Sequence, residues 1–414
     1  MSKIKYLKRK LENGLTVIIH RDTATAMASV NILYKVGARN EKFEHTGLAH
    51  LAEHLMFSGT EAVPNFDAAM QSAAAENNAF TCNDYTNYYI ALPAVNIERA
   101  LYVEADRMAN LTVSSESLEV QRKVVVEEFA QRYKNQPYGD VWPILREMAY
   151  PEAHPYSWPT IGRYSEHIEK TTLEDINEFY ERFYTPQNAI LSIVSPEDEE
   201  KIFSLAQKWF APIKPKHSDS LERDFSFFSY TNQRKEVERD VPASMIYICF
   251  PMQGRTSRQA VALDVATDIL SGGESSRLVQ RLVKGEALFS SVNCYLTAEE
   301  GTGLLVATGR TMEGVSLQRA EEALLKELKT LTTEEVTPQE LEKVRNKYEA
   351  NNYFSLINSL NKAMNLAYYE FLGDAEMINT AVSTHASISA QEVKETCLDL
   401  FQDSHRTTLY YNAR

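Results

Sequence analysis

Apolar and β-branched residues recur along the first half of the chain in short blocks that alternate with amphipathic stretches. Blocks of strand-like composition are expected to be strands at 15–20, 28–36, 78–82, 85–92 and 189–194. The polar pair Asn83–Asp84 marks a turn between two of them. A hydrophobic repeat or a helix-favouring composition predicts helices at 46–57, 68–76, 97–110, 116–133 and 172–184. Thr46 is expected to cap the first of these helices.

The second half repeats the order of the first, which indicates duplication of a unit of about 200 residues. Residues 243–250 match the early strand, and 304–309 match a later one. Residues 258–270 match the first helix, and the long helical stretch 338–372 matches the region around Glu128. Short strands interleaved with helices favour an α+β fold. We therefore expect two homologous α/β-sandwich subdomains with mainly antiparallel sheets covered by helices.

The segment between the two halves lacks a regular pattern. Residues 211–240 contain two prolines, mixed charge and weak periodicity, which are typical of a linker. We expect a first domain at 1–213, a linker at 214–238 and a second domain at 239–414. The second domain carries no copy of the histidine motif described below.

Composition and charge narrow the classes of function. The chain has 44% hydrophobic and 24% charged residues, as a globular protein does. Its formal net charge of −14 disfavours nucleic acid, because an acidic surface repels phosphate backbones. No apolar run has the length of a signal peptide or a membrane span. The expected location is therefore the cytoplasm. The four cysteines form no CxxC pair and are expected to be buried, reduced thiols.

The motif that carries chemistry is HLAEH, residues 50–54. His50 and His54 are four residues apart, so on a helix their side chains share one face and can converge on a zinc ion. Glu53 points to the same side and is the expected general base. This order is the inverted form of the commoner zinc-protease motif. The alternative is a solvated helix face, but the apolar neighbours favour a half-buried helix, where an unpaired Glu53 would be costly.

Two histidines leave a catalytic zinc site one protein ligand short, and a carboxylate from another helix would complete it. Glu127 and Glu128 follow a run of three valines. Glu128 comes four residues after Val124 and three after Val125, so it is expected to face inward with them. Glu127 is turned by about 100° and is expected to face water. An ordinary exposed acidic patch is the alternative for this pair.

These residues stand within a longer set of motifs that resembles the pitrilysin family of zinc peptidases, which includes the mitochondrial processing peptidase. The matching segments run through nearly the whole chain. They are NGLTVI at 13–18, VGARNE at 36–41, HLAEHLMFSGT at 50–60, NAFTCNDYTNYY at 78–89, VVVEE at 124–128, FYTPQNAILSIV at 183–194 and GGESSRLVQRL at 272–282. The resemblance implies a half-size member with one zinc ion per chain, which hydrolyses unstructured peptides.

The resemblance also implies a role for each matching position. Glu128 would be the third zinc ligand beside the two histidines, and Glu53 would take a proton from the attacking water. Asn78 and Ala79 fall where the family presents an edge strand to an extended peptide. Gln121 stands where the family often has a glutamate, so any support from it would be a neutral hydrogen bond.

Two positions in the second half depart from the family pattern. Active members usually carry an Arg and a Tyr where this chain has Val283 and Ser290. Valine cannot donate a hydrogen bond to a developing oxyanion, and serine is too short to replace tyrosine. The expected assembly is a heterodimer with a zinc-less homologue that supplies the Arg and the Tyr. The alternatives are an active homodimer, a non-proteolytic scaffold subunit and a purely structural zinc site.

Overall fold

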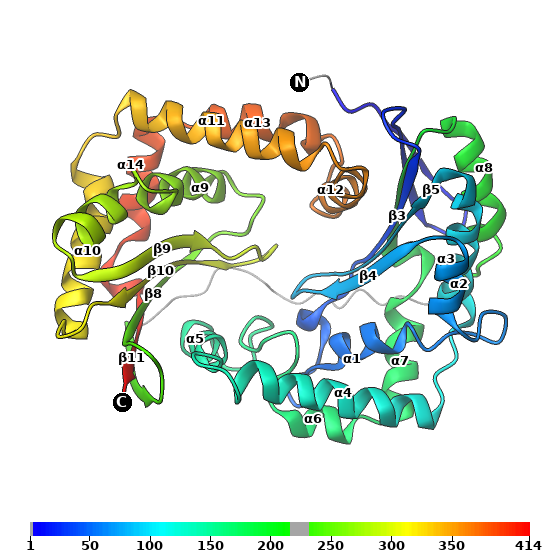
Figure 1. Ribbon diagram of the computed structural model, residues 1–414, viewed down its shortest axis with the longest axis horizontal. Helices are drawn as coiled ribbons and strands as arrows, with labels where there is room; N and C mark the ends of the chain where they lie inside the picture. Colours follow the sequence, from blue (N-terminus) through cyan, green and yellow to red (C-terminus); the bar gives the residue numbers. More distant parts are fainter. Residues whose placement is uncertain (1–2, 216–231) are drawn as a thin grey trace. The chain divides into compact units, whose positions relative to one another are not determined.

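The computed structural model describes residues 3–215 and 232–414, which form two compact units (Figure 1). Unit 1 comprises the described parts of Met1–Arg132, Trp158–Arg223 and Tyr353–Thr380. Unit 2 comprises the described parts of Tyr133–Ser157, Asp224–Asn352 and Ala381–Arg414. Within these described ranges, no helix has the length and apolar character needed to cross a membrane.

Unit 1 is built on a six-stranded sheet. Its strands are β1 (Leu7–Lys10), β2 (Thr16–Arg21), β3 (Met27–Tyr34), β4 (Glu76–Thr81), β5 (Thr86–Pro93) and β6 (Ala189–Ser195). Their order in the sheet is β1-β2-β6-β3-β5-β4, and β2·β6 is the parallel pair. The central strands β3 and β6 are buried along almost their whole length, which explains their nearly continuous apolar sequence. The strand β4 lies at the edge of the sheet.

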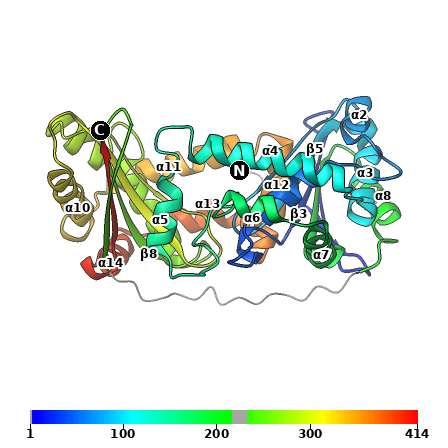
Figure 2. The same cartoon turned by 90° about the horizontal axis from the view of Figure 1, so that it is seen from below.

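Helices cover both faces of this sheet (Figures 1 and 2). The helices of unit 1 are α1 (Leu48–Leu55), α2 (Phe66–Ser72), α3 (Ile97–Asn110), α4 (Ser115–Tyr133), α6 (Ser165–Lys170), α7 (Leu173–Phe183), α8 (Glu199–Phe210) and α12 (Ser359–Phe371). Helices α3 and α8 pack on one face and α12 on the other (Figure 1). Leu366 and Ala367 of α12 pack with Ile18, Leu33 and Ile190 of the sheet.

Unit 2 is built on a five-stranded sheet. Its strands are β7 (Gln233–Arg239), β8 (Met245–Met252), β9 (Phe289–Leu296), β10 (Gly303–Thr311) and β11 (Thr407–Ala413). Its helices are α5 (Val141–Ala149), α9 (Arg258–Ser271), α10 (Leu317–Thr333), α14 (Ala390–Leu400) and the larger parts of α11 (Pro338–Ser355) and α13 (Met377–Ala386). A π-helix, η4, spans Val279–Gly285. Short 3-10 helices in the chain are η1 (Ala38–Asn40), η2 (Ala94–Asn96), η3 (Pro186–Asn188) and η5 (Asp403–His405).

The two sheets confirm the expected α+β class. The order in unit 2 is β7-β11-β8-β10-β9, with β7·β11 as the parallel pair. The order β2-β6-β3-β5-β4 in unit 1 has the same pattern of one parallel pair followed by antiparallel pairs. This shared topology agrees with the duplication that the sequence indicated.

The structure corrects two expected helices. The stretch 338–372 is two helices, because Asn358 lies between them and its side chain accepts a hydrogen bond from the Leu360 N–H at the start of α12. The helix expected at 68–76 ends at Ser72. The chain then enters β4, whose pairing with β5 outweighs the helix propensity of the alanines.

The expected linker, 214–238, falls mostly on residues 216–231, which lie outside the described residues. Its last part belongs instead to β7. The compact units also differ from the expected continuous domains, 1–213 and 239–414, by an exchange of segments. The helix α5 packs on β8 and β11, and α12 packs on β3 and β6. The helix α5 comes from the first half of the chain but packs on the sheet of unit 2, and α12 comes from the second half but packs on the sheet of unit 1.

Candidate active site

Helix α1 carries three of the expected site residues. It begins after Gly47, which adopts φ +89°, and a Cβ at this position would lie 2.7 Å from the carbonyl oxygen of Ile161. Glycine is therefore required there. The carboxylate of Glu41 accepts hydrogen bonds from the Gly47 N–H at 2.9 Å and the Ala49 N–H at 2.7 Å. The prediction that Thr46 caps this helix is wrong, because its hydroxyl pairs with His167 Nδ1 at 2.9 Å instead of with the N–H groups of the first turn.

The apolar face of α1 fixes the helix in the core. Leu51, Ala52 and Leu55 are fully buried. The Tyr180 hydroxyl donates a hydrogen bond to the Ala52 carbonyl at 2.5 Å. The imidazoles of His50 and His54 then share the other side, with ring centroids 4.8 Å apart and planes at 78°.

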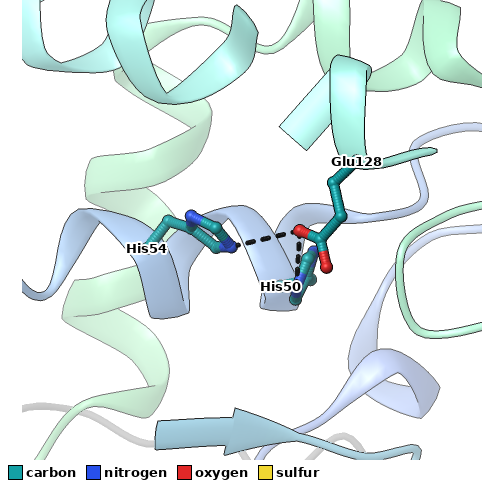
Figure 3. Close-up of side chains that lie close together, drawn as sticks. All are labelled: His50, His54 and Glu128. Atoms are coloured by element: carbon teal, nitrogen blue, oxygen red, sulfur yellow. Dashed lines mark ion pairs between the residues drawn. The ribbon is translucent and has the colours of Figure 1, made fainter. Parts of the chain in front are cut away.

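Helix α4 brings a carboxylate to the two imidazoles (Figure 3). Glu128 Oε2 lies 3.6 Å from His50 Nε2 and 3.5 Å from His54 Nε2. Ligands at about 2.0–2.1 Å from one tetrahedral zinc ion lie about 3.4 Å from one another. One possible ligand atom from each of the three residues lies within 4.8 Å of the other two. Among the described residues, this is the single cluster of three or more His, Cys, Asp or Glu side chains that could hold a metal ion. The nitrogen and oxygen donors and their spacing fit zinc.

The inward face of α4 differs in one respect from the expectation. Val125 is fully buried, as expected, but Val124 is 45% exposed. The buried side of the helix carries Leu118, Val125 and Phe129. Val124 precedes Val125 by one residue, so its side chain points about 100° away from that of Val125. Glu128 therefore shares its face with Val125 alone. Glu127 is exposed, as expected.

Gln121 and Arg132 contact His54 and Glu128 from the helix α4. Gln121 Oε1 lies 3.2 Å from His54 Nδ1. An amide oxygen can only accept, so this contact places the ring proton on Nδ1 and leaves the lone pair of Nε2 free for a metal. The guanidinium of Arg132 forms an ion pair with the other oxygen of Glu128. Within the described residues, the buried Nδ1 of His50 has no hydrogen-bond partner.

Burial and neighbouring charges set the protonation of the site. Burial, with help from His54, lowers the pKa of His50 to about 4, so this imidazole is neutral near pH 7. Burial is the largest influence on His54 and lowers its pKa, but the contact with Glu128 and the charges of Glu53 and Glu128 together outweigh it, so the net shift is upward. The same contact lowers the pKa of Glu128. Burial raises the pKa of Glu53, and a hydrogen bond from Thr81 partly offsets the rise.

The edge strand β4 runs past α1. The hydroxyl of Thr81, its last residue, donates a hydrogen bond to Glu53 Oε2 at 2.6 Å. The turn to β5 is closed by a hydrogen bond from Cys82 N–H to the Tyr85 carbonyl. Hydrogen-bonded and non-hydrogen-bonded residue pairs alternate along two antiparallel strands. Starting from the hydrogen-bonded pair at the turn, Asn78 directs its backbone N–H and C=O toward β5, whereas Ala79 directs them toward the open edge. The Ala79 N–H is accordingly held by the side-chain oxygen of Asn78, at 2.8 Å.

An open cavity of about 470 Å³ adjoins the first half of β4. Its lining includes Asp67 and Gln71 of α2 and Glu76, Asn77 and Asn78 of β4.

In unit 2, Val283 lies in η4, and Ser290 lies in β9, where its hydroxyl donates to the Arg310 carbonyl at 3.3 Å.

Sequence reasoning missed the polar partners of the site. Thr81, Glu41 and Arg132 each contact a predicted residue or the helix that carries it. Arg132 could have been found, because it follows Glu128 by four residues on one helix. Thr81 and Glu41 come from other elements, and their spacing gives no such signal.

Two families match the chain. Residues 16–154 match the family described as "Insulinase (Peptidase family M16)", and residues 170–348 match "Peptidase M16 inactive domain". His50, His54 and Glu128 all fall within the first match. The zinc protease PqqE of Helicobacter pylori is 29% identical over 415 residues, which cover 97% of this chain and 91% of that protein. The uncharacterized zinc protease YmxG of Bacillus subtilis is 24% identical, with 96% of each chain covered.

Solved structures share the fold. The crystal structure of a protease from Helicobacter pylori matches with a TM-score of 0.92 and 26% identity, over 99% of this chain and 100% of that one. Pitrilysin matches with a TM-score of 0.83 at 18% identity, which is a likeness of fold alone. That match covers 99% of this chain but 45% of pitrilysin.

Proposed function

We propose that this chain, which belongs to the M16 peptidase family as a half-size member, is a zinc metalloendopeptidase that hydrolyses unstructured peptides. The observation that carries the proposal is the approach of Glu128 Oε2 to within 3.6 Å of His50 Nε2 and 3.5 Å of His54 Nε2. Two neutral nitrogens and a carboxylate are the protein ligands of many catalytic zinc sites, which keep a fourth position for water.

The chemistry divides between the metal and Glu53. Zinc, when bound, lowers the pKa of a coordinated water and polarises the scissile carbonyl. Glu53 lies on the same face of α1 as the two histidines, and its pKa is raised by burial. A carboxylate with a raised pKa is suited to accept the proton of the attacking water and to deliver it to the leaving amine.

The open edge of β4 supports an extended peptide as the substrate. Ala79 directs its N–H and C=O away from β5, and the side chain of Asn78 covers that N–H. A peptide that adds to this edge would take over the Ala79 hydrogen bond, and the Asn78 amide would be free to contact the peptide. Only a chain without its own strand or helix partners can pair in this way, so unstructured peptides are the proposed substrates.

The proposed assembly is a heterodimer with a zinc-less homologue. Val283 is apolar, and the short hydroxyl of Ser290 already donates to Arg310. Neither side chain offers the donor that family members place near the oxyanion, and one such donor contributes about 10²–10³ in rate. The isolated chain should therefore hydrolyse peptides slowly, and a co-purifying homologue with Arg and Tyr should accelerate it. Full activity of the isolated chain would favour the homodimer instead.

All four cysteines are free thiols, which supports the cytoplasm as the proposed location.

The competing function is that of a non-proteolytic scaffold with the same fold. Metal analysis and a peptide-hydrolysis assay of Glu53→Gln separate the two. The proposed peptidase binds one zinc per chain, and Glu53→Gln retains the zinc but loses about 10²–10⁴ in rate. A scaffold has no zinc-dependent hydrolysis for the substitution to remove.

A further inference from the structure

We infer that Thr81 is a positioning residue for Glu53, linking the strand that would hold the peptide to the group that would activate the water. This inference rests on the proposed function. Thr81 Oγ1 lies 2.6 Å from Glu53 Oε2. Among the residues that the structure describes, its hydroxyl is the one side-chain donor to this carboxylate.

The hydrogen bond has a defined direction. Thr86 lies opposite Thr81 in the β4·β5 pair, and its hydroxyl donates to the Val36 carbonyl at 2.8 Å. Its single proton is thus committed, so it does not compete for Glu53. The Thr81 hydroxyl lies 3.5 Å from the Thr86 hydroxyl and 2.6 Å from the charged Glu53 oxygen, and the shorter contact to the ion takes the Thr81 proton.

Holding one carboxylate oxygen has a consequence for the other. A glutamate side chain has three rotatable bonds, and the charge of the nearby Glu128 repels the Glu53 carboxylate. The bond to Thr81 fixes Glu53 Oε2 and leaves Oε1 as the oxygen that can accept a proton from water. Because a reacting group must sit in a narrow range of positions, losing this restraint lowers the rate of the chemical step more than it weakens peptide binding.

Thr81 also belongs to the edge that would receive the peptide. Thr81 forms a non-hydrogen-bonded pair with Thr86, as Ala79 does with Tyr88. The backbone N–H and C=O groups of Thr81 and Ala79 therefore both point toward the open edge of the sheet. They are two residues apart, or roughly 7 Å along the strand. The strand that would align the peptide backbone therefore also aligns Glu53, and the two cannot move independently.

The test compares Thr81→Val with Thr81→Ser in the zinc-loaded protein. Valine keeps the β-branched shape and strand propensity but removes the donor, and serine keeps the donor. Thr81→Val should lower kcat about 10- to 100-fold, as expected for a bond to a charged group, with little change in KM, zinc content or melting temperature. Thr81→Ser should stay within about threefold of the parent. In a Glu53→Gln background, Thr81→Val should have no further effect on residual hydrolysis.

A crystal structure of Thr81→Val supplies a readout that needs no activity. The inference expects the Glu53 side chain to leave its position or to occupy several. Unchanged kcat together with an unmoved Glu53 would overturn it, as would an equal loss in the Glu53→Gln background. Failure of the proposed function looks different, since Glu53→Gln would then hydrolyse peptides as fast as the parent.

Discussion

The carboxylate of Glu128 approaches the imidazole of His54 to 3.5 Å, although the two residues come from different helices, α4 and α1. A third group, His50 Nε2, lies 3.6 Å from the same oxygen. Without a cation, this contact brings a charged oxygen close to two imidazoles, and it raises the pKa of His54. A divalent ion would satisfy all three groups at once. The stability of the fold should therefore depend on zinc.

Removing zinc with a chelator should lower the melting temperature of the parent protein. Free zinc at about 1,000 times its Kd adds about 4 kcal/mol to the stability of a protein that binds it only when folded. Glu128→Gln loses a charged ligand and should show a much smaller response to zinc. Glu127→Gln removes the adjacent exposed carboxylate and is the matched control, which should respond as the parent does. Equal zinc responses in the two variants would exclude Glu128 as a ligand.

Gln121→Leu tests the support of His54. The leucine cannot accept the proton of His54 Nδ1, so the ring loses its fixed tautomer and orientation. Zinc affinity, measured by competition with a chelator, should fall about 10- to 100-fold. Gln131→Leu, on the exposed side of the same helix, should leave the affinity unchanged. An unchanged affinity in Gln121→Leu would mean that packing alone orients His54.

The sequence was sufficient for local features. The i, i+4 histidines, the helix around Glu128 and a strand at 78–82 follow from short-range sequence patterns. The expectation that Asn78 and Ala79 lie on an edge strand came from the family resemblance. The phase of α4 was predicted less well, because three consecutive valines make Val124 and Val125 equally apolar. Only tertiary packing decides which of them is buried.

Features that depend on distant segments could not be predicted. The helix α12 packs on the sheet of unit 1, yet it reads as the continuation of α11 in sequence. The carboxylate of Glu41 caps α1 from outside the helix, so the usual capping position gave the wrong residue. Thr81 gave no signal because a threonine in a strand is ordinary.

Ala79→Pro tests the open edge of β4. Proline removes the Ala79 N–H, which points away from β5, so the pairing of the sheet should survive. If a peptide carbonyl accepts a hydrogen bond from this N–H, kcat/KM should fall roughly 3- to 10-fold, with a small change in melting temperature. Asn78→Pro is the matched control, because it removes an N–H that points at β5 and should mainly destabilise the protein. An unchanged kcat/KM in Ala79→Pro would argue against strand addition at this position.

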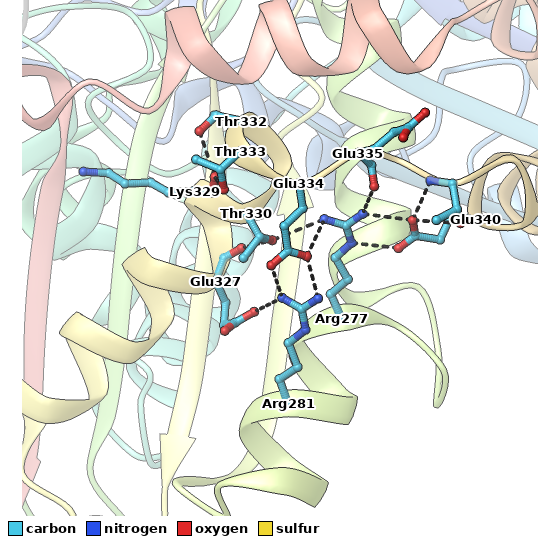
Figure 4. A network of polar contacts seen from close by, with 11 residues as sticks. Arg277, Arg281, Glu327, Lys329, Thr330, Thr332, Thr333, Glu334, Glu335 and Glu340 are labelled. Carbon is cyan, nitrogen blue, oxygen red and sulfur yellow. Dashed lines mark hydrogen bonds and ion pairs between the residues drawn. The ribbon is translucent and has the colours of Figure 1, made fainter.

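A partly buried ion pair in unit 2 predicts how stability depends on acid (Figure 4). The Arg277 side chain is 7% exposed and donates to both oxygens of Glu340, at 2.7 and 2.9 Å. The hydrogen bond from Arg277 lowers the pKa of Glu340 to about 2 in the folded protein. Because the folded pKa lies below the unfolded value, the pair stabilises the fold above about pH 4.5, and this contribution is lost as the pH falls toward 2.

Glu340→Gln should therefore lower the free energy of unfolding near pH 7, by on the order of 1–2 kcal/mol after allowance for solvent screening. The gap between parent and variant should close as the pH falls from about 4.5 toward 2, and urea unfolding across that range measures it. Glu342→Gln, at an exposed position on the same helix, is the control and should track the parent at every pH. A gap that stays constant with pH would mean that Glu340 acts through packing or as the cap of α11, where it accepts from the Thr337 N–H at 2.9 Å, and not through its charge.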